Sequence, residues 1–218
     1  MTIEIKNLSK DFKKNTVLNN IDMKLEEGNI YGFIGRNGSG KSVLLKILCG
    51  LYRPTKGEVL YDGVDIFKNK SFAPDTRALI EKPGFINDLT GYENLEMLAL
   101  IQDKITNKDI ENVLKDVNLF EEKDKKYGKY SLGMKQKLGI AQVLMENPKV
   151  IILDEPFNGV EEETVLKLRK LLIKEKARGK LIIIASHIKE DIESLANIVY
   201  KFDNGNVSLV VENSNKKN

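Results

Sequence analysis

The stretch Gly35-Arg36-Asn37-Gly38-Ser39-Gly40-Lys41-Ser42 matches the pattern G-x-x-x-x-G-K-[ST] of a phosphate-binding loop. Its flanks suit the motif, because residues 29–34 are typical of a short buried strand and the apolar run that opens with Val43 is typical of a helix. A strand, a glycine-rich loop and a helix in this order are the context that the motif requires. The alternative interpretation is a glycine-rich turn that only connects the strand to the helix.

The residue types in this loop suit the phosphates of a nucleoside triphosphate. Gly38 and Gly40 lack a Cβ, so the backbone can wrap around the phosphates and point its N–H groups inward. The helix that follows adds the positive end of its dipole. Lys41 offers a cation to the β- and γ-phosphates, and Ser42 offers a hydroxyl to Mg²⁺. Binding is therefore expected at Gly35, Arg36, Asn37, Gly38, Ser39, Gly40, Lys41 and Ser42.

Bulk composition narrows the class of protein. The chain has 218 residues, of which 41% are hydrophobic and 31% charged, as in an ordinary globular domain. Its net charge of +3 is too small to indicate a nucleic acid or an anionic membrane as the partner. The single Cys49 excludes an internal disulfide framework and is expected to be a core thiol. The apolar runs are too short for a transmembrane helix, so any membrane role requires a partner.

The first half of the chain predicts strands and then a helical block. Residues 2–8 and 17–25 alternate as antiparallel strands do, and residues 57–62 predict another strand before the turn at Asp62-Gly63. From about residue 92 to residue 120 the periodicity is helical, and strand signals are missing. Two apolar stripes mark this block: Leu95, Leu98, Ala99 and Ile101, and then Ile110, Val113, Leu114 and Val117. We expect a helical subdomain at about residues 84–140, inserted into a single domain of residues 1–212.

The second half returns to strands. Residues 150–153 and 181–185 are continuous apolar runs, as expected of parallel strands that are buried on both faces, and a helix at 162–178 separates them. Residues 197–202 and 207–211 predict a terminal hairpin, and residues 213–218 a disordered tail. The predicted fold is therefore α/β: a parallel P-loop core, an N-terminal antiparallel β subdomain and the helical insertion.

Two acidic residues end the first of these apolar strands. Val150-Ile151-Ile152-Leu153-Asp154-Glu155 is a Walker B pattern, and it follows the phosphate-binding loop along the chain. Asp154, at the carboxyl end of the strand, can hold Mg²⁺ through water. Glu155 is placed to orient and deprotonate the attacking water.

A third motif, Tyr130-Ser131-Leu132-Gly133-Met134-Lys135-Gln136-Lys137, leads into a helix expected at residues 138–145. With this motif the chain resembles the nucleotide-binding subunits of ABC transporters over nearly its whole length. The signature of that family is L-S-G-G-Q, and Ser131 and Gly133 keep its serine and second glycine. A serine and a glycine at a helix N-terminus form an anion site, which the resemblance implies binds the γ-phosphate held by the opposite subunit. The alternative is that Ser131 is a plain helix N-cap.

The resemblance also implies roles for single residues. It identifies His187, the only histidine of the chain, as the switch-loop histidine that contacts the γ-phosphate and steadies Glu155. Phe12 stands where an aromatic ring stacks on the adenine. The resemblance thus implies ATP and Mg²⁺ as ligands. It implies that the catalytic residues are Lys41, Glu155 and His187.

Several positions depart from the family pattern. Glu81 replaces the usual glutamine after the strand that leads into the helical block, which removes an amide donor and adds a negative charge. Glu161 replaces the aspartate that ends the D-loop, and Leu132 and Met134 replace a glycine and the glutamine of the signature. None of these changes touches the expected catalytic residues. We therefore expect hydrolysis to be retained, and to be slow without a partner.

Residues 79–85, 89–95 and 130–135 are similar to one branch of the family, the bacitracin-resistance and lantibiotic-immunity ATPases. This likeness implies an ATP-hydrolysing subunit that powers the export of a peptide antibiotic or another amphipathic molecule. The implied partners are a transmembrane permease subunit and a second copy of the chain or a related ATPase subunit, and no nucleic acid. The implied location is cytoplasmic, on the inner face of the membrane through the permease.

Two other functions stay open from the sequence. One is a soluble ABC-type ATPase that acts on DNA or ribosomes, although the chain has neither the long coiled coils of the first group nor the paired nucleotide domains of the second. The other is a weakly active scaffold subunit paired with an active partner, which the changes at Glu81, Leu132 and Met134 would suit. The residues of this chain do not predict which molecule is transported or whether it is exported or imported. They also do not predict whether the dimer contains two copies of the chain or two related chains.

Overall fold

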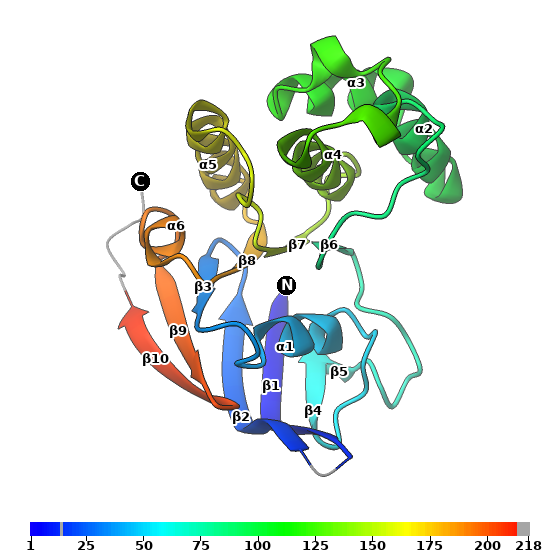
Figure 1. Ribbon diagram of the computed structural model, residues 1–218. Coiled ribbons are helices and arrows are strands. Elements are labelled where there is room, and N and C mark those ends of the chain that lie inside the picture. Colours follow the sequence, from blue (N-terminus) through cyan, green and yellow to red (C-terminus); the bar gives the residue numbers. More distant parts are fainter. Residues whose placement is uncertain (14, 213–218) are drawn as a thin grey trace.

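The computed structural model describes residues 1–13 and 15–212, and its strands form two sheets with helices packed on them (Figure 1). The strands are β1 (Thr2–Phe12), β2 (Asn15–Glu26), β3 (Ile30–Ile34), β4 (Lys56–Tyr61), β5 (Val64–Asp65), β6 (Thr76–Leu79), β7 (Val150–Asp154), β8 (Leu181–Ser186), β9 (Ile198–Asp203) and β10 (Asn206–Glu212). The helices are α1 (Lys41–Leu48), α2 (Gly91–Gln102), α3 (Asn107–Asp116), α4 (Leu132–Leu144), α5 (Glu162–Ala177) and α6 (Lys189–Glu193), with short 3₁₀ turns η1 (Phe120–Glu122) and η2 (Tyr127–Lys129). The tail that we expected to be disordered, residues 213–218, lies outside the described residues.

The two sheets confirm the predicted fold class. Among the described residues, the smaller sheet has the order β2-β1-β4-β5, and its neighbouring strands are antiparallel. The larger sheet has the order β10-β9-β3-β8-β7-β6, in which every pair is parallel except the edge pair of β10 and β9. The expected terminal hairpin is present, and its first strand also joins the parallel sheet beside β3, which the sequence did not indicate.

The larger sheet is buried on both faces because different layers cover them. Ile152 and Ile183 belong to a core shared with α1 and the smaller sheet, whereas Ile151 and Ile182 belong to a core shared with the helices α2 to α6. All four side chains are fully buried. Because both faces of the sheet are covered, the sequences of β7 and β8 are continuous apolar runs. Burial also raises the pKa of the Cys49 thiol, just after α1, to about 12. The expected core thiol is partly buried and packs against the core that α1 shares with the smaller sheet.

The helices α2, α3 and α4 lie together above the sheet in Figure 1, and the chain enters them after β6 and leaves them before β7. Since β6 and β7 are neighbours in the sheet, the whole helical block is inserted between two adjacent strands. Its limits as a separate subdomain, at about residues 84 and 140, stay a prediction. The helix expected at 138–145 begins earlier, at Leu132, because the Ser131 hydroxyl caps it by accepting the Met134 N–H at 3.2 Å.

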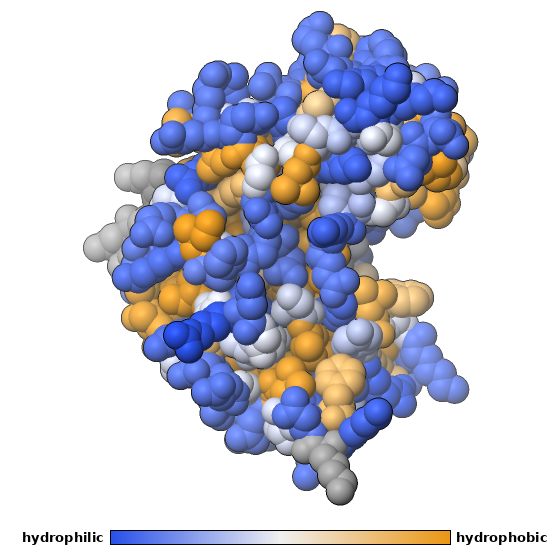
Figure 2. All heavy atoms as spheres, viewed as in Figure 1, coloured by the Kyte–Doolittle hydropathy of each residue, from blue (hydrophilic) through white to orange (hydrophobic). Residues whose placement is uncertain are grey.

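The prediction that Ile101 belongs to a buried apolar stripe was wrong. Leu95 and Ala99 are buried as expected, but Ile101 is 75% exposed, since it lies near the end of α2, where no other element within residues 1–13 and 15–212 covers it. Leu100 beside it is 72% exposed. In Figure 2 apolar side chains gather at the edge of the helical block where Figure 1 places α2. The end of α2 therefore carries an apolar surface.

A small residue in β3 allows α6 to approach the sheet closely. A Cβ added to Gly32 would lie 2.1 Å from Cγ2 of Ile192 and 2.9 Å from Cβ of Ala196. Such distances are too short for carbon atoms, so a larger residue at this position must push α6 away. Because only Ile188 separates Ser186 and His187 from α6, this contact also helps to place the polar residues at the end of β8.

We predict that Gly32→Ala lowers the free energy of unfolding by about 1–3 kcal/mol through overpacking, measured by urea denaturation. The matched control is Gly84→Ala, since a Cβ at Gly84 meets nothing within 4 Å. This control is expected to change stability by less than about 1 kcal/mol. Equal losses in the two variants would contradict the close packing of α6 on β3.

Candidate functional site

The phosphate-binding loop leaves β3 at Ile34 and enters α1 at Lys41. Gly38 and Gly40 have φ values of +79° and +106°, in the left-handed region that favours glycine. A Cβ on Gly40 would also lie 2.9 Å from the carbonyl oxygen of Val17. The loop therefore needs glycine at these positions, and its shape is the open cradle that phosphate oxygens require.

Two polar side chains of this loop are buried. The Lys41 ammonium donates to the carbonyl oxygens of Gly35 at 2.6 Å and of Arg36 at 3.1 Å. Burial lowers the pKa of Lys41, and the nearby carboxylates of Glu155 and Asp154 act in the opposite direction. The Ser39 hydroxyl oxygen is buried and has no hydrogen-bond partner among the described residues. A buried hydroxyl without a partner needs an explanation, and a bound phosphate oxygen supplies one.

The expected ligands of Mg²⁺ lie in contact. The Ser42 hydroxyl, at the start of α1, donates to Oδ2 of Asp154 at 2.6 Å, at the end of β7. Burial raises the pKa of Asp154, and the hydrogen bond from Ser42 opposes that rise. A hydroxyl and a carboxylate are the oxygen donors that Mg²⁺ prefers, and Mg²⁺ usually completes its shell with water and substrate phosphates. The residues present therefore fit Mg²⁺ that arrives with a triphosphate.

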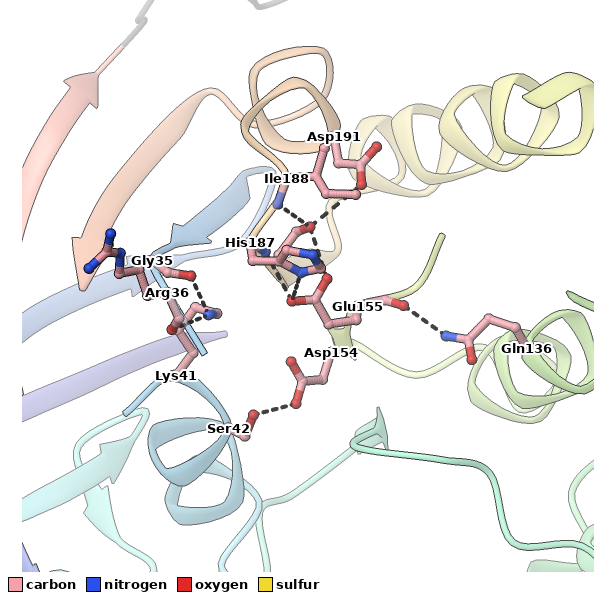
Figure 3. A network of polar contacts seen from close by, with 11 residues as sticks. Gly35, Arg36, Lys41, Ser42, Gln136, Asp154, Glu155, His187, Ile188 and Asp191 are labelled. Carbon is pink, nitrogen blue, oxygen red and sulfur yellow. Dashed lines mark hydrogen bonds and ion pairs between the residues drawn. The ribbon is translucent and has the colours of Figure 1, made fainter. Parts of the chain in front are cut away.

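Glu155 is held in an unusual backbone conformation beside His187. Its φ is +48°, which is uncommon for a residue with a side chain and is often found at functional sites. One carboxylate oxygen, Oε1, accepts the backbone N–H of His187 at 2.9 Å and lies 2.8 Å from Nδ1 of the same residue (Figure 3). The sequence analysis expected His187 to steady Glu155, and the two side chains do lie in contact.

Sequence reasoning missed a further set of polar residues around Glu155. The Ser186 hydroxyl donates to Oε2 of Glu155 at 3.1 Å and accepts the Ile188 N–H at 3.1 Å. Oδ2 of Asp191 lies 3.5 Å from the same hydroxyl, and Oδ1 of Asp191 accepts from Arg169 at 2.8 Å. The sequence signal was a serine that ends an otherwise apolar strand and precedes His187.

Another missed residue is Gln136, on α4. Its side-chain amide donates to the backbone carbonyl of Glu155 at 3.0 Å (Figure 3). Only 7% of Gln136 is exposed, so this contact satisfies a buried amide. A glutamine among the apolar residues of α4 was the available signal.

One cavity of about 850 Å³ gathers most of the predicted site residues. Phe12 is 42% exposed, and its ring meets that of Tyr52 edge to face with the ring centres 5.7 Å apart. The ammonium group of Lys10 also lies over this ring, 4.8 Å from its centre. The cavity is lined by Phe12, Asn37, Gly38, Ser39, Gly40, Lys41, Ser42, Glu81, Leu132, Asp154 and Glu155, among others.

Ser131 and Gly133 are not among the residues that line this cavity. Both lie at the start of α4, where a Cβ on Gly133 would lie 2.5 Å from the carbonyl oxygen of Gly159. Further along α4, Nζ of Lys137 lies 3.9 Å from the carboxylate of Glu161. The start of α4 is thus packed on the segment that follows Glu155, and the role of Ser131 and Gly133 toward a second subunit stays a prediction.

Searches for related sequences agree with this geometry. Residues 18–158 match the ABC transporter family. The chain is 41% identical over 203 residues to the uncharacterized ABC transporter ATP-binding protein YybJ of Bacillus subtilis (strain 168), with 93% of each chain covered. It is 40% identical over 199 residues to the bacitracin transport ATP-binding protein BcrA of Enterococcus faecalis, covering 90% of this chain and 65% of that protein. It is 34% identical over 219 residues to the lantibiotic transport ATP-binding protein SrtF of Streptococcus pyogenes, covering 99% and 93%.

Solved structures show the same fold. An ATP-binding subunit of an ABC transporter matches with a TM-score of 0.85 and 25% identity, covering 96% of this chain and 90% of that one. The ATP-binding cassette MJ0796, in a dimeric post-hydrolysis state bound to ADP and Pi, matches with a TM-score of 0.84 and 24% identity, covering 95% of this chain and 98% of that one. No helix within residues 1–13 and 15–212 is long and apolar enough to cross a membrane. The chain therefore belongs to the ABC transporter family, as an ATP-binding and ATP-hydrolysing subunit.

Proposed function

We propose that this chain binds ATP with Mg²⁺ as a dimer and powers a separate membrane subunit that exports a peptide antibiotic or another amphipathic molecule. The observation that carries the proposal is the meeting of Lys41, Asp154 and Glu155 around one cavity, with His187 in contact with Glu155. Phosphoryl transfer to water needs a cation, a Mg²⁺ ligand, a base and a residue that positions the base.

The loop residues account for the binding of ATP. Lys41 is the buried cation of the loop, and phosphate oxygens would give it stronger, charge-assisted partners than the two carbonyl oxygens that it contacts. The Ser39 hydroxyl gains the hydrogen-bond partner that it lacks. Ser42 and Asp154 hold the Mg²⁺ that neutralises phosphate charge, and Phe12 offers a ring face to the adenine.

Glu155 is the base of the hydrolysis step. Both of its carboxylate oxygens are engaged, one by His187 and the other by Ser186, so the group is fixed before water arrives. It takes a proton from the water that attacks the γ-phosphate, and fixed charges around the phosphate supply most of the rate. The residues that perform these steps are all present, which favours an active enzyme over a scaffold subunit.

The start of α4 suits the second half of a dimeric ATP site. Ser131 is exposed, and the backbone N–H groups of the first turn of α4 point toward the helix N-terminus, where anions bind. In a dimer this end would face the γ-phosphate held by the partner subunit. The same arrangement joins the site to Glu155, because Gln136 of the same helix contacts the carbonyl of that residue.

The proposed cargo and membrane partner rest on the relatives. Two of them are named for bacitracin transport and lantibiotic transport, and both compounds are peptide antibiotics. The exposed apolar end of α2, with Leu100 and Ile101, is a suitable surface for a membrane subunit. Such a partner would keep the chain at the cytoplasmic face of the membrane.

Glu155→Gln is expected to abolish turnover, with a loss of about 100-fold or more, because the amide cannot accept the proton from water. ATP binding is expected to persist, since the phosphate-binding loop is unchanged. Phosphate release measures the first outcome and calorimetric titration the second, with the exposed Glu163→Gln on α5 as the control. Hydrolysis at the parent rate would show that Glu155 is not the base.

Ser186→Ala is expected to lower kcat about 5- to 30-fold while KM stays unchanged, because it removes one hydrogen bond that orients the Glu155 carboxylate. Ser186→Thr keeps the hydroxyl and is expected to retain more of the rate. Ser194→Ala, on the surface beyond α6, is the control. A rise in KM with an unchanged kcat would instead place Ser186 in substrate binding.

The membrane partner can be tested directly with the same Glu155→Gln variant. Tagged protein loaded with ATP and Mg²⁺ is recovered from detergent-solubilised native cells, and mass spectrometry identifies the proteins that accompany it. We expect a polytopic membrane protein, on which cargo can then be tested. Ribosomal proteins or DNA-bound factors without a membrane protein would contradict the transport function.

A further inference from the structure

Glu81, which stands in the place of the family's usual glutamine, forms an ion pair with Lys46. Nζ of Lys46 lies 2.5 Å from Oε1 of Glu81, although the two residues are 35 positions apart in the chain. Lys46 lies in the last turn of α1, the helix that begins with Lys41 and Ser42. Glu81 lies on the connection that follows β6 and leads to the helical block. The pair therefore joins the ATP-binding helix to that connection.

The position of Glu81 creates an electrostatic problem for ATP. Glu81 lines the same cavity as Asp154 and Glu155, together with Lys41 and Lys82, so a third acidic residue borders the space that the phosphates would enter. Glu81 is close enough to Asp154 to favour its protonated form, alongside the larger effect of burial on the pKa of Asp154. A glutamine would add no charge there. An unpaired carboxylate at this position would repel the triphosphate, and solvent would reduce that repulsion because 65% of the Glu81 side chain is exposed.

Lys46 is well placed to remove this problem. Its side chain is 19% exposed, and its ammonium group lies 5.3 Å from the centre of the Tyr52 ring, a distance that suits a cation–π contact. The hydrogen bond with Glu81 raises the pKa of Lys46, so the amine stays charged. The backbone of Glu81 has φ of +64°, a conformation uncommon for glutamate, and its side chain in this conformation reaches Lys46.

We propose that Lys46 is a positioning residue for ATP binding: it holds the Glu81 carboxylate against the end of α1 and cancels its charge, so that a cavity with three carboxylates can accept ATP. This inference rests on the proposed function. Lys46 acts through Glu81, so its importance depends on which residue occupies position 81. With glutamine at that position, Lys46 has no charge to neutralise.

This dependence is tested with four proteins: the parent, Lys46→Met, Glu81→Gln and the double variant. Binding of the non-hydrolysable analogue AMP-PNP with Mg²⁺ is measured by isothermal titration calorimetry at low ionic strength. We expect Lys46→Met to raise Kd about three- to tenfold in the parent, and the effect to shrink at high salt as the charges are screened. In the Glu81→Gln background, the same substitution is expected to leave Kd nearly unchanged.

Lys167→Met is the matched control, since it removes a lysine from another ion pair, with Glu163 on α5 and outside the cavity. It is expected to leave Kd unchanged. Thermal unfolding without nucleotide shows whether each variant is folded, and recovery of affinity in the double variant shows that Lys46→Met does not act by damaging the fold. Equal weakening in both backgrounds, or no weakening in the parent, would overturn the inference. If the parent protein itself does not bind AMP-PNP, both the inference and the proposed function fail.

Discussion

The parallel register of β3, β8 and β7 is the constraint on which the site depends. Ile34 pairs with Ser186, and Ala185 pairs with Asp154, so the three strands end at the same edge of the sheet. Each strand is fixed by apolar residues that are buried on both faces, and a shift of register would expose them. The polar residues at and beyond the ends of these strands are therefore brought together mainly by the packing of the apolar residues before them.

At that edge the backbone adopts conformations that ordinary residues avoid. Glu155 after β7 and Glu81 after β6 both have positive φ values, and each such residue costs of order 1 kcal/mol. In both cases the carboxylate finds a specific partner, His187 for one and Lys46 for the other. The two acids follow neighbouring strands and have different partners, so they can serve different roles.

The sequence predicted those parts of the site that are local in the chain. The loop from Gly35 to Ser42, the acids at Asp154 and Glu155 and the lone His187 each belong to a short motif, and the structure brings all of them together. The contacts of Lys46 with Glu81 and of Ser186 with Glu155 were not predicted, because they join separate segments and depend on side-chain direction. Ile101 was misplaced for a related reason: periodicity identifies a helical face, but only tertiary packing decides how far along the helix that face is covered.

The pairing of Lys46 with Glu81 has a consequence for how such a sequence can evolve. A chain with glutamine at position 81 can acquire Lys46 at little cost, because α1 ends there and a lysine near a helix C-terminus is favourable. A glutamate that arises first would stand unpaired at the mouth of the ATP site. If the proposal holds, the less costly order of substitutions is the lysine first and the acid second. Loss of the acid first would likewise be the less costly first step of a reversal.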